Sequence, residues 1–202
     1  QDVRFRISTA DGTAVAGEDY TAKSQLLSIP AGSLSTTFSV AVRGDTRDEF
    51  NETFDVVLSE VVDATVATGT GTGTIVDDDD PPLVSVSDVT VTEGNTGTVN
   101  AVFIISLSQA SGKNVTVNYR TTDSTATAPA DYTAVSGTLT FAPGETEKTV
   151  TVAVKGDLLY EGTERFFLDL TASNNGTFDD SRGIGTILDN EPVPGIRISD
   201  RS

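Results

Sequence analysis

The 202-residue sequence contains no cysteine, histidine, methionine or tryptophan. Without cysteine the chain can form no disulfide, and it offers neither a thiol nucleophile nor a zinc–thiolate site. Without histidine it lacks the commonest general base and the commonest transition-metal ligand. No apolar run approaches the roughly 20 residues that a membrane-spanning helix requires, and no signal peptide is recognisable. These absences argue against nucleophilic catalysis and against a transition-metal centre.

Basic residues are also scarce. Lysine and arginine total 13 against 30 aspartates and glutamates, so the formal net charge at pH 7 is −17. Nucleic acid and an anionic membrane surface would both be repelled by such a chain. We therefore expect an acidic soluble protein whose natural cationic partner is a metal ion.

The sequence is an internal repeat with an offset of 112 residues. Asp19-Tyr20-Thr21-Ala22 returns as Asp131-Tyr132-Thr133-Ala134, and Gly73-Thr74-Ile75 returns as Gly185-Thr186-Ile187. Placing residues 1–90 on residues 113–202 gives 32 identities without a gap. A fixed offset of this kind indicates tandem copies of one structural unit.

The repeat predicts three segments in the chain. Residues 1–80 form a first repeat that lacks the counterpart of 83–112, and residues 81–192 form a complete repeat. Residues 193–202 match the opening of a repeat and are expected to start a third. The chain is therefore expected to be a slice of a longer tandem array.

The hydrophobic pattern predicts strands. Apolar side chains alternate from Val99 to Leu107 and from Val150 to Val154, and no stretch keeps an amphipathic helical pattern for three turns. In the complete repeat we expect strands near 84–92, 97–107, 114–121, 137–141, 147–154, 165–172 and 183–188. The predicted fold is all-β: tandem immunoglobulin-like antiparallel β-sandwiches of about seven strands each, the first truncated at its N-terminus.

Alternating strand directions would gather carboxylates at one end of each sandwich. In the complete repeat these residues are Glu93, Asp131, Asp157, Glu161, Glu164, Asp189 and Glu191. In the first repeat they are Asp19, Asp45, Glu49, Glu52, Asp77, Asp78 and Asp79. The two sets hold 14 of the 30 acidic residues, so the excess charge is concentrated rather than spread for solubility.

Such clusters favour a hard cation. Seven carboxylates at one loop end repel one another unless a cation lies between them. Oxygen ligands without imidazole or thiolate indicate Ca²⁺ before Mg²⁺, and roughly two to four Ca²⁺ ions would neutralise one complete cluster. The alternative is that these acidic loops are merely solvated, but the same spacing in two repeats argues against it.

Several motifs of the complete repeat together resemble the Calx-beta family. They are Val91-Thr92-Glu93-Gly94, Ala130-Asp131-Tyr132, the segment from Gly156 to Phe166, and the closing Gly185-Thr186-Ile187-Leu188-Asp189-Asn190-Glu191. The resemblance implies that the acidic residues of both clusters, together with Asn190, are calcium ligands. The sequence departs from the family's ligand pattern in two places. Asn190 and Glu191 replace a pair of aspartates, and the first repeat has no counterpart of Glu93.

We expect a calcium-binding, non-catalytic repeat of a large extracellular or cell-surface protein, in which Ca²⁺ at the interdomain end stiffens the array, for example in an adhesin. One alternative is a calcium-sensing regulatory domain, as the exchanger members of the family suggest. Another is a carbohydrate-binding or accessory module of a secreted enzyme. Paired carboxylates such as Glu161 and Glu164 could also serve glycoside hydrolysis, but no aromatic groove supports that reading.

The truncated repeat has a further consequence. The missing strands include the counterpart of Phe103, Ile105 and Leu107, so the core of residues 1–80 should be uncovered. Unpaired strand edges invite pairing with another chain. Strands from another molecule are one expected remedy, with Gly195–Ser199 a candidate donor. The other expectations are trimming of the chain and a weak five-stranded remnant that stays folded.

Overall fold

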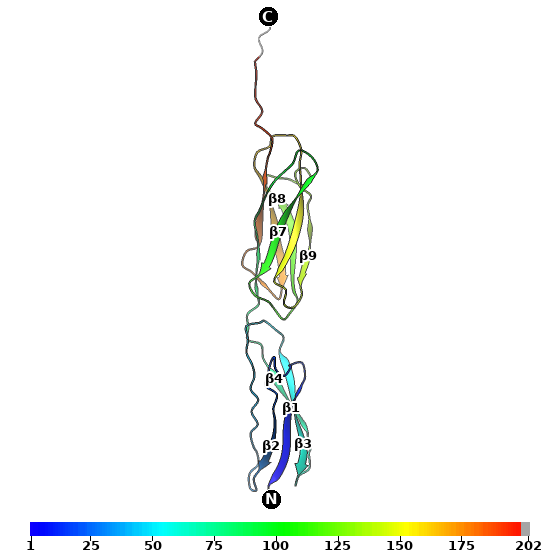
Figure 1. The fold of residues 1–202 in the computed structure, drawn as a ribbon, viewed down its shortest axis with the longest axis vertical. Coiled ribbons are helices and arrows are strands. Elements are labelled where there is room, and N and C mark those ends of the chain that lie inside the picture. Colours follow the sequence, from blue (N-terminus) through cyan, green and yellow to red (C-terminus); the bar gives the residue numbers. More distant parts are fainter. Residues whose placement is uncertain (199–202) are drawn as a thin grey trace. The chain divides into compact units, whose positions relative to one another are not determined.

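The computed structural model describes residues 1–198, and every regular element among them is a β-strand. The chain divides into two compact units, Gln1–Asp80 (unit 1) and the residues from Pro81 onward (unit 2) (Figure 1). Among the described residues there is no helix long and apolar enough to cross a membrane. The predicted all-β class is therefore confirmed.

Unit 2 consists of two facing sheets. The strands are β5 (Leu83–Val86), β6 (Val89–Thr92), β7 (Thr98–Leu107), β8 (Val115–Asp123), β9 (Ser136–Phe141), β10 (Glu147–Lys155), β11 (Glu164–Asn174), β12 (Thr177–Phe178) and β13 (Arg182–Leu188). One sheet has the order β10-β7-β5-β12 and the other the order β6-β13-β11-β8-β9. Alternate side chains of both sheets face inward, as a sandwich requires.

Two details of the sequence-based strand prediction were wrong. The strand expected at 84–92 is divided between the two sheets, because the side chains of Ser87 and Asp88 accept hydrogen bonds from the backbone N–H groups of Ile104 and Ile184, which belong to different sheets. The pairing is also not purely antiparallel. β6 runs parallel to β13, and the two-residue β12 runs parallel to β5.

Aromatic rings form the centre of the unit 2 core. Phe166 stacks on Tyr132 with ring centroids 4.5 Å apart and meets Phe103 edge-on at 5.8 Å. All three side chains are buried. A Cβ atom at Gly185 would lie 2.4 Å from the Phe166 ring, so only glycine leaves room for this ring. The Tyr132 hydroxyl donates to the Asp123 carboxylate, which satisfies the polar end of a buried ring.

Unit 1 contains a single sheet. Its strands are β1 (Val3–Asp11), β2 (Ser24–Ile29), β3 (Glu52–Val62) and β4 (Thr70–Ile75), in the order β2-β1-β3-β4. At the offset of 112 these strands match β8, β9, β11 and β13. Residues 35–43 match β10 but form no strand, because within the described chain no segment of unit 1 takes the place of β7, the partner of β10.

The core of unit 1 is correspondingly small. It consists of Ala14, Tyr20 and Phe54, with the two rings stacked at 4.7 Å. Val42 is 52% exposed, whereas its counterpart Val154 is fully buried. The apolar inner face of this sheet is therefore only partly covered.

Residues 193–198 follow β13 without forming a strand. They are the described part of the segment predicted to start a third repeat. The remainder of that prediction, residues 199–202, lies outside the described residues.

Candidate metal centre

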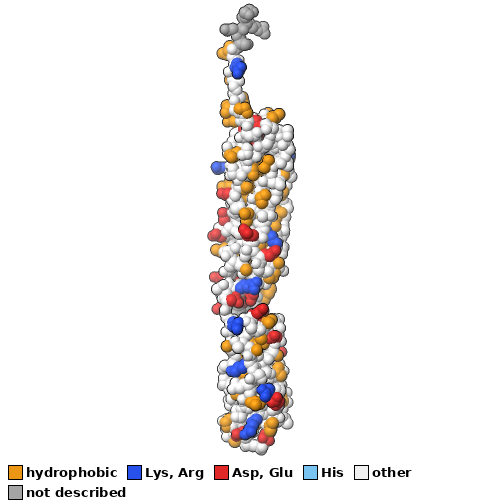
Figure 2. Space-filling view, in the orientation of Figure 1, with side chains coloured by type: hydrophobic (Ala, Val, Ile, Leu, Met, Phe, Trp, Pro, Cys, Tyr) orange, Lys and Arg blue, Asp and Glu red, His pale blue; other side chains and the backbone are white. Residues whose placement is uncertain are grey.

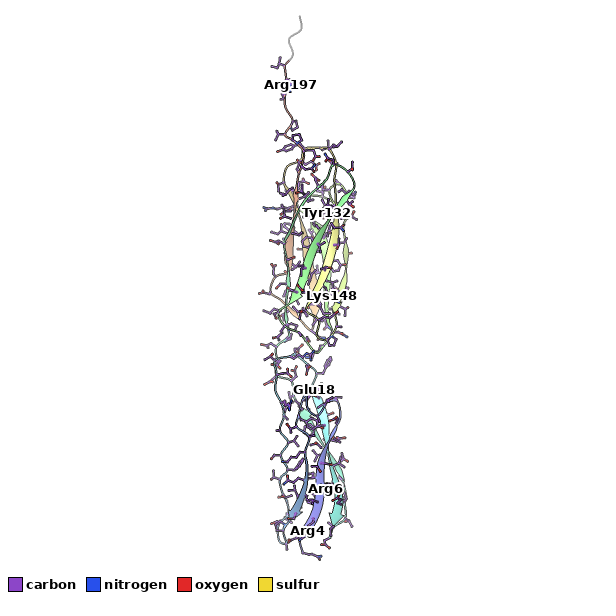
Figure 3. All side chains as sticks on the ribbon, viewed as in Figure 1. Arg4, Arg6, Glu18, Tyr132, Lys148 and Arg197 are labelled. Atoms are coloured by element: carbon purple, nitrogen blue, oxygen red, sulfur yellow. The ribbon has the colours of Figure 1, made fainter. Side chains whose placement is uncertain are left out.

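The acidic residues predicted in unit 2 lie in connections at one end of the sandwich. Glu93 follows β6, and Asp157 follows β10. Glu161 lies just before β11, which begins at Glu164. Asp131 lies between β8 and β9, and the segment from Asp189 to Glu191 follows β13. In Figure 3, Tyr132, the neighbour of Asp131, lies nearer this end than Lys148 does.

Six of these carboxylates form two close groups. Glu93, Asp189 and Glu191 place oxygens within 4.8 Å of one another, and so do Asp131, Glu161 and Glu164. Asp157 joins the groups electrostatically, because its charge raises the pKa of Glu93, Glu161 and Glu164. All seven acidic residues predicted in this unit are thus brought together.

Asp189 connects the chain exit to the loop before β11. One of its carboxylate oxygens accepts hydrogen bonds from the backbone N–H groups of Glu161 and Gly162, both at 2.7 Å, and the other accepts from that of Glu191 at 2.7 Å. The bond from Gly162 is the largest of the effects that lower the pKa of Asp189 to about 2. Asp189 therefore stays ionised and fixes the loop that carries Glu161.

Two glutamates of the cluster are poised to bind a proton near neutrality. Burial, followed by the charge of Asp157, raises the pKa of Glu93 to about 7. Burial, followed by the charge of Asp131, raises the pKa of Glu164 to about 7. Glu93 is only 7% exposed. Each of these groups would be stabilised in its ionised form by a cation.

These raised pKa values predict how stability depends on pH without calcium. A carboxyl group whose pKa rises on folding binds its proton more tightly in the folded chain, so stability should fall as pH rises from about 4.5 to about 7 and then level off. We expect unit 2 in calcium-free buffer to melt several degrees higher at pH 5 than at pH 8. Saturating calcium should reduce or reverse this difference, and scanning calorimetry at the two pH values measures it. Higher stability at pH 8 in the calcium-free protein would contradict the prediction.

The chemistry of the donors fits a metal ion. Among the described residues, one carboxylate oxygen of Glu191, Oε2, is buried without a hydrogen-bond partner. Leaving a buried charged oxygen unsatisfied is costly in free energy, and a cation held with Glu93 and Asp189 would satisfy it. The all-oxygen, anionic donor set is of the kind that Ca²⁺ and Mg²⁺ prefer.

Asn190, predicted as a ligand from the resemblance, is engaged elsewhere. Its side-chain amide donates to Asn95 Oδ1 at 3.1 Å, and Asn95 in turn donates to Glu191 Oε1 at 2.8 Å. Asn95 was not predicted as a site residue from the sequence. Its side chain links the first loop to the chain exit and orients a carboxylate, and no sequence signal distinguishes it from an ordinary turn residue.

Unit 1 repeats the cluster around a cavity of about 120 Å³. All seven predicted acidic residues line it: Asp19, Asp45, Glu49, Glu52, Asp77, Asp78 and Asp79. Burial is the largest cause of the raised pKa values of Glu49, Glu52 and Asp79, and neighbouring carboxylates add to it. Asn51, missed in the sequence, accepts a hydrogen bond from the backbone N–H of Asp77.

One arginine, Arg47, distinguishes the unit 1 cluster from that of unit 2, since Arg43 corresponds to another cation, Lys155. Arg43 and Arg47 both line the cavity, and Arg47 lies 3.5 Å from Glu49. The counterpart of Arg47 in unit 2 is the uncharged Leu159. The unit 1 cluster is therefore partly neutralised by its own chain, a difference visible in the sequence but missed because only the acidic residues were compared.

Comparisons with known proteins identify the family of the chain. The family model described as "Calx-beta domain" matches the chain twice, over residues 1–79 and 77–191. Sodium/calcium exchanger 1 of Canis lupus familiaris is 40% identical over 77 residues, which are 38% of this chain and 8% of the exchanger. Sodium/calcium exchanger 2 of Rattus norvegicus is 44% identical over 54 residues, 27% of this chain and 6% of the exchanger. The segments that match this chain thus cover less than a tenth of the length of each exchanger.

Solved structures with similar folds include the apo-form Calx CBD1 domain and CBD12 from CALX1.2. The first is 24% identical and covers 54% of this chain and 98% of its own, with a TM-score of 0.45. The second is 20% identical and covers 93% of this chain and 87% of its own, with a TM-score of 0.44. Since the family model matches nearly the whole chain in two consecutive segments, the chain belongs to the Calx-beta domain family.

Proposed function

We propose that the chain is a calcium-binding, non-catalytic tandem of Calx-beta domains. The observation that carries the proposal is the convergence of carboxylates from separate connections of unit 2, among them the buried Glu93, together with the unpartnered Glu191 Oε2. Ca²⁺ accepts six to eight oxygen ligands in irregular geometry, which suits side chains from four separate connections. Roughly two to four ions would balance the seven carboxylates of this unit.

Calcium binding would add to the links that already join the connections at this end of the sandwich. Glu93 and Glu191 end two different segments of the sandwich, and their charges repel each other in the absence of a cation. In unit 1 the acidic segment Asp77–Asp79 leads directly into Asp80-Pro81-Pro82. An ion at that cluster would fix the point where the chain leaves unit 1, and the prolines limit bending beyond it. We infer a mechanical role: calcium stiffens an array of such domains in an extracellular or cell-surface protein.

A calcium-sensing regulatory role is the second candidate, favoured by the sequence similarity to the sodium/calcium exchangers. Affinity separates the two roles. Sensor sites bind Ca²⁺ with dissociation constants of about 10⁻⁷–10⁻⁵ M, whereas extracellular modules bind at about 10⁻⁴–10⁻³ M. Calorimetric titration of the whole chain with calcium therefore distinguishes a sensor from a structural array.

The calcium site itself is tested by one pair of variants. Glu161→Ala should weaken calcium binding by about tenfold or more, because it removes a ligand charge from the Asp131 group. Asp180→Ala should leave the affinity unchanged, because Asp180 lies before β13, at the end of that strand opposite Asp189, where it accepts a hydrogen bond from the backbone of Arg182.

The same pair of variants shows whether a loss of affinity reflects misfolding. Removing Glu161 relieves repulsion in the cluster, so in calcium-free buffer the variant should melt no lower than the wild-type chain. Equal losses of affinity in both variants would rule out the proposed site.

A further inference from the structure

The connection between β8 and β9, which carries Asp131, is held by the side chain at the end of β8. Asp123, the last residue of β8, accepts two hydrogen bonds through a single carboxylate oxygen, Oδ1. The backbone N–H of Ala128 donates to this oxygen at 2.9 Å, and the hydroxyl of Tyr132 also donates to it. Asp123 therefore fixes both the middle and the end of the segment 123–132.

Asp131 is oriented within this segment by backbone groups. Its Oδ2 accepts a hydrogen bond from the backbone N–H of Thr127 at 2.6 Å, and its own N–H donates to the carbonyl oxygen of Thr127 at 2.9 Å. These bonds fix the direction of the Asp131 carboxylate, which belongs to the same close group as Glu161 and Glu164. The shape of the segment thus determines where one carboxylate of this group lies.

The same segment is attached to β11 beside Glu164. Thr125 Oγ1 accepts a hydrogen bond from the backbone N–H of Arg165 at 2.7 Å. The backbone N–H of Ala126, a fully buried residue, donates to the carbonyl oxygen of Arg165 at 2.8 Å. Because Arg165 directly follows Glu164 in the chain, the segment that orients Asp131 also sets its distance from Glu164.

Unit 1 repeats these contacts at the offset of 112. Asp11 Oδ1 accepts hydrogen bonds from the hydroxyl of Tyr20 at 2.6 Å and from the backbone N–H of Ala16 at 2.9 Å. Asp19 Oδ2 accepts a hydrogen bond from the backbone N–H of Val15 at 2.6 Å. Six of the ten positions are identical between residues 11–20 and residues 123–132. They include the aspartate, the threonine and the tyrosine whose side chains hold the segment.

The contacts of Asp123, rather than its charge, distinguish it from other surface carboxylates. Asp123 is exposed, and Figure 2 shows acidic side chains scattered over the visible surface of each unit. Its partner Tyr132 is buried and stacks on Phe166. The hydroxyl is therefore held in place from the side of the core, and it gives the carboxylate a fixed point to which the segment is tied.

We propose that Asp123 and Tyr132 are positioning residues of the calcium site, which hold Asp131 at the distance from Glu164 that an ion requires. The inference rests on the proposed function, and neither positioning residue contacts the ion. Ordering a loop costs conformational entropy, so a loop already held in the binding geometry binds an ion more tightly than one that the ion must order.

Three variants separate the hydrogen bond from the charge of Asp123. Tyr132→Phe keeps this charge and the stacked ring but removes the donor, so the calcium affinity of unit 2 should fall about three- to tenfold. Asp123→Asn removes the charge but keeps Oδ1 as an acceptor, so the affinity should stay within about twofold of the wild-type value. Asp123→Ala removes both and should weaken binding about tenfold or more.

NMR titration of the whole chain with calcium measures these affinities, because the backbone amides of unit 2 report on its own site. Tyr119→Phe is the matched control. It removes a tyrosine hydroxyl from β8 outside the acidic cluster and should leave the affinity unchanged.

A double-mutant cycle tests whether Tyr132 acts through Asp131. In an Asp131→Ala background, Tyr132→Phe should cause no further loss of affinity, since the carboxylate that it positions is gone. In a Glu191→Gln background it should cause its full loss, because Glu191 belongs to the other close group. General weakening of the fold by Tyr132→Phe would instead lower the affinity equally in both backgrounds.

Hydrogen exchange in chelator measures the same anchors without calcium. The amide of Ala128 should exchange about three- to tenfold faster in Tyr132→Phe than in the wild-type chain, and near the wild-type rate in Asp123→Asn. Unchanged exchange and affinity in Tyr132→Phe, or equal losses of affinity in Asp123→Asn and Asp123→Ala, would overturn the positioning role while leaving the calcium site intact. A wild-type chain that binds no calcium would overturn the proposed function and this inference with it.

Discussion

Calcium at about 2 mM, on the order of extracellular levels, should raise the melting temperature of unit 2 by on the order of ten degrees over the value in chelator. At this concentration an ion that binds only the folded state with a dissociation constant of about 10⁻³–10⁻⁴ M adds about 0.6–1.8 kcal/mol, and the contributions of the roughly two to four ions expected in the cluster add together. For a domain of about 100 residues, 1 kcal/mol corresponds to roughly 4–8 °C. Relief of the repulsion among Glu93, Asp157 and Glu164 is the physical source of this gain.

The two units should respond unequally. Arg47 already offsets part of the charge around Glu49, so calcium should shift the transition of unit 1 less than that of unit 2. Scanning calorimetry with chelator, calcium and magnesium resolves the transitions, and magnesium serves as the control for unspecific charge screening. Identical midpoints in chelator and calcium would refute the calcium site.

Gly156→Ala should destabilise unit 2 by about 2–4 kcal/mol. A Cβ atom at this position would lie 1.6 Å from the carbonyl oxygen of Gly94, and the Gly156 N–H donates to Gly97. Both contacts are with backbone, which cannot move aside by changing a rotamer. The substitution should therefore displace the loop that carries Glu93 and weaken calcium binding together with stability. Urea unfolding and calorimetric titration measure the two effects.

Gly44→Ala is the matched control, because Gly44 occupies the corresponding position of unit 1 and a Cβ atom there meets nothing within 4 Å. We expect its effect on stability to stay within about 0.5 kcal/mol. A comparable loss in both variants would mean that the close approach of Gly156 to the first loop does not exist in solution.

Much of this architecture could be predicted from the sequence. Alternating apolar residues such as Phe103 and Ile105 locate the strands, and the repeat offset transfers each strand from one unit to the other. Alternating strand directions also predict that connections far apart in sequence meet at one end. These features depend on local periodicity and chain connectivity, both of which a single sequence contains.

The remaining features depend on contacts between distant side chains. The division of the strand at Ser87 and Asp88 follows from hydrogen bonds to residues of two other strands, while the sequence there reads as one continuous alternation. Asn190 stands at a ligand position of the family motif in place of an aspartate, but its orientation is set by Asn95, which lies 95 residues earlier. The hydrophobic pattern and the motifs of a sequence do not identify these hydrogen-bond partners.

The parallel pairing of β6 with β13 has a consequence under tension. The chain enters unit 2 through β5 and β6 and leaves it through β13, and the pair is in register from Val89 opposite Gly185 to Thr92 opposite Leu188. A pulling force acts first on β5, passes from it to the N-terminal end of β6, and acts on β13 at its C-terminal end. Because the two strands run in the same direction, the force slides one along the other and loads all their hydrogen bonds at once, instead of opening them one by one.

Glu93 follows the C-terminal end of β6, and Asp189 follows that of β13. Their carboxylates belong to the same close group. An ion held between them would add a clamp across the pair of strands that bears the load. Calcium would then set the force at which unit 2 ruptures, in addition to its melting temperature.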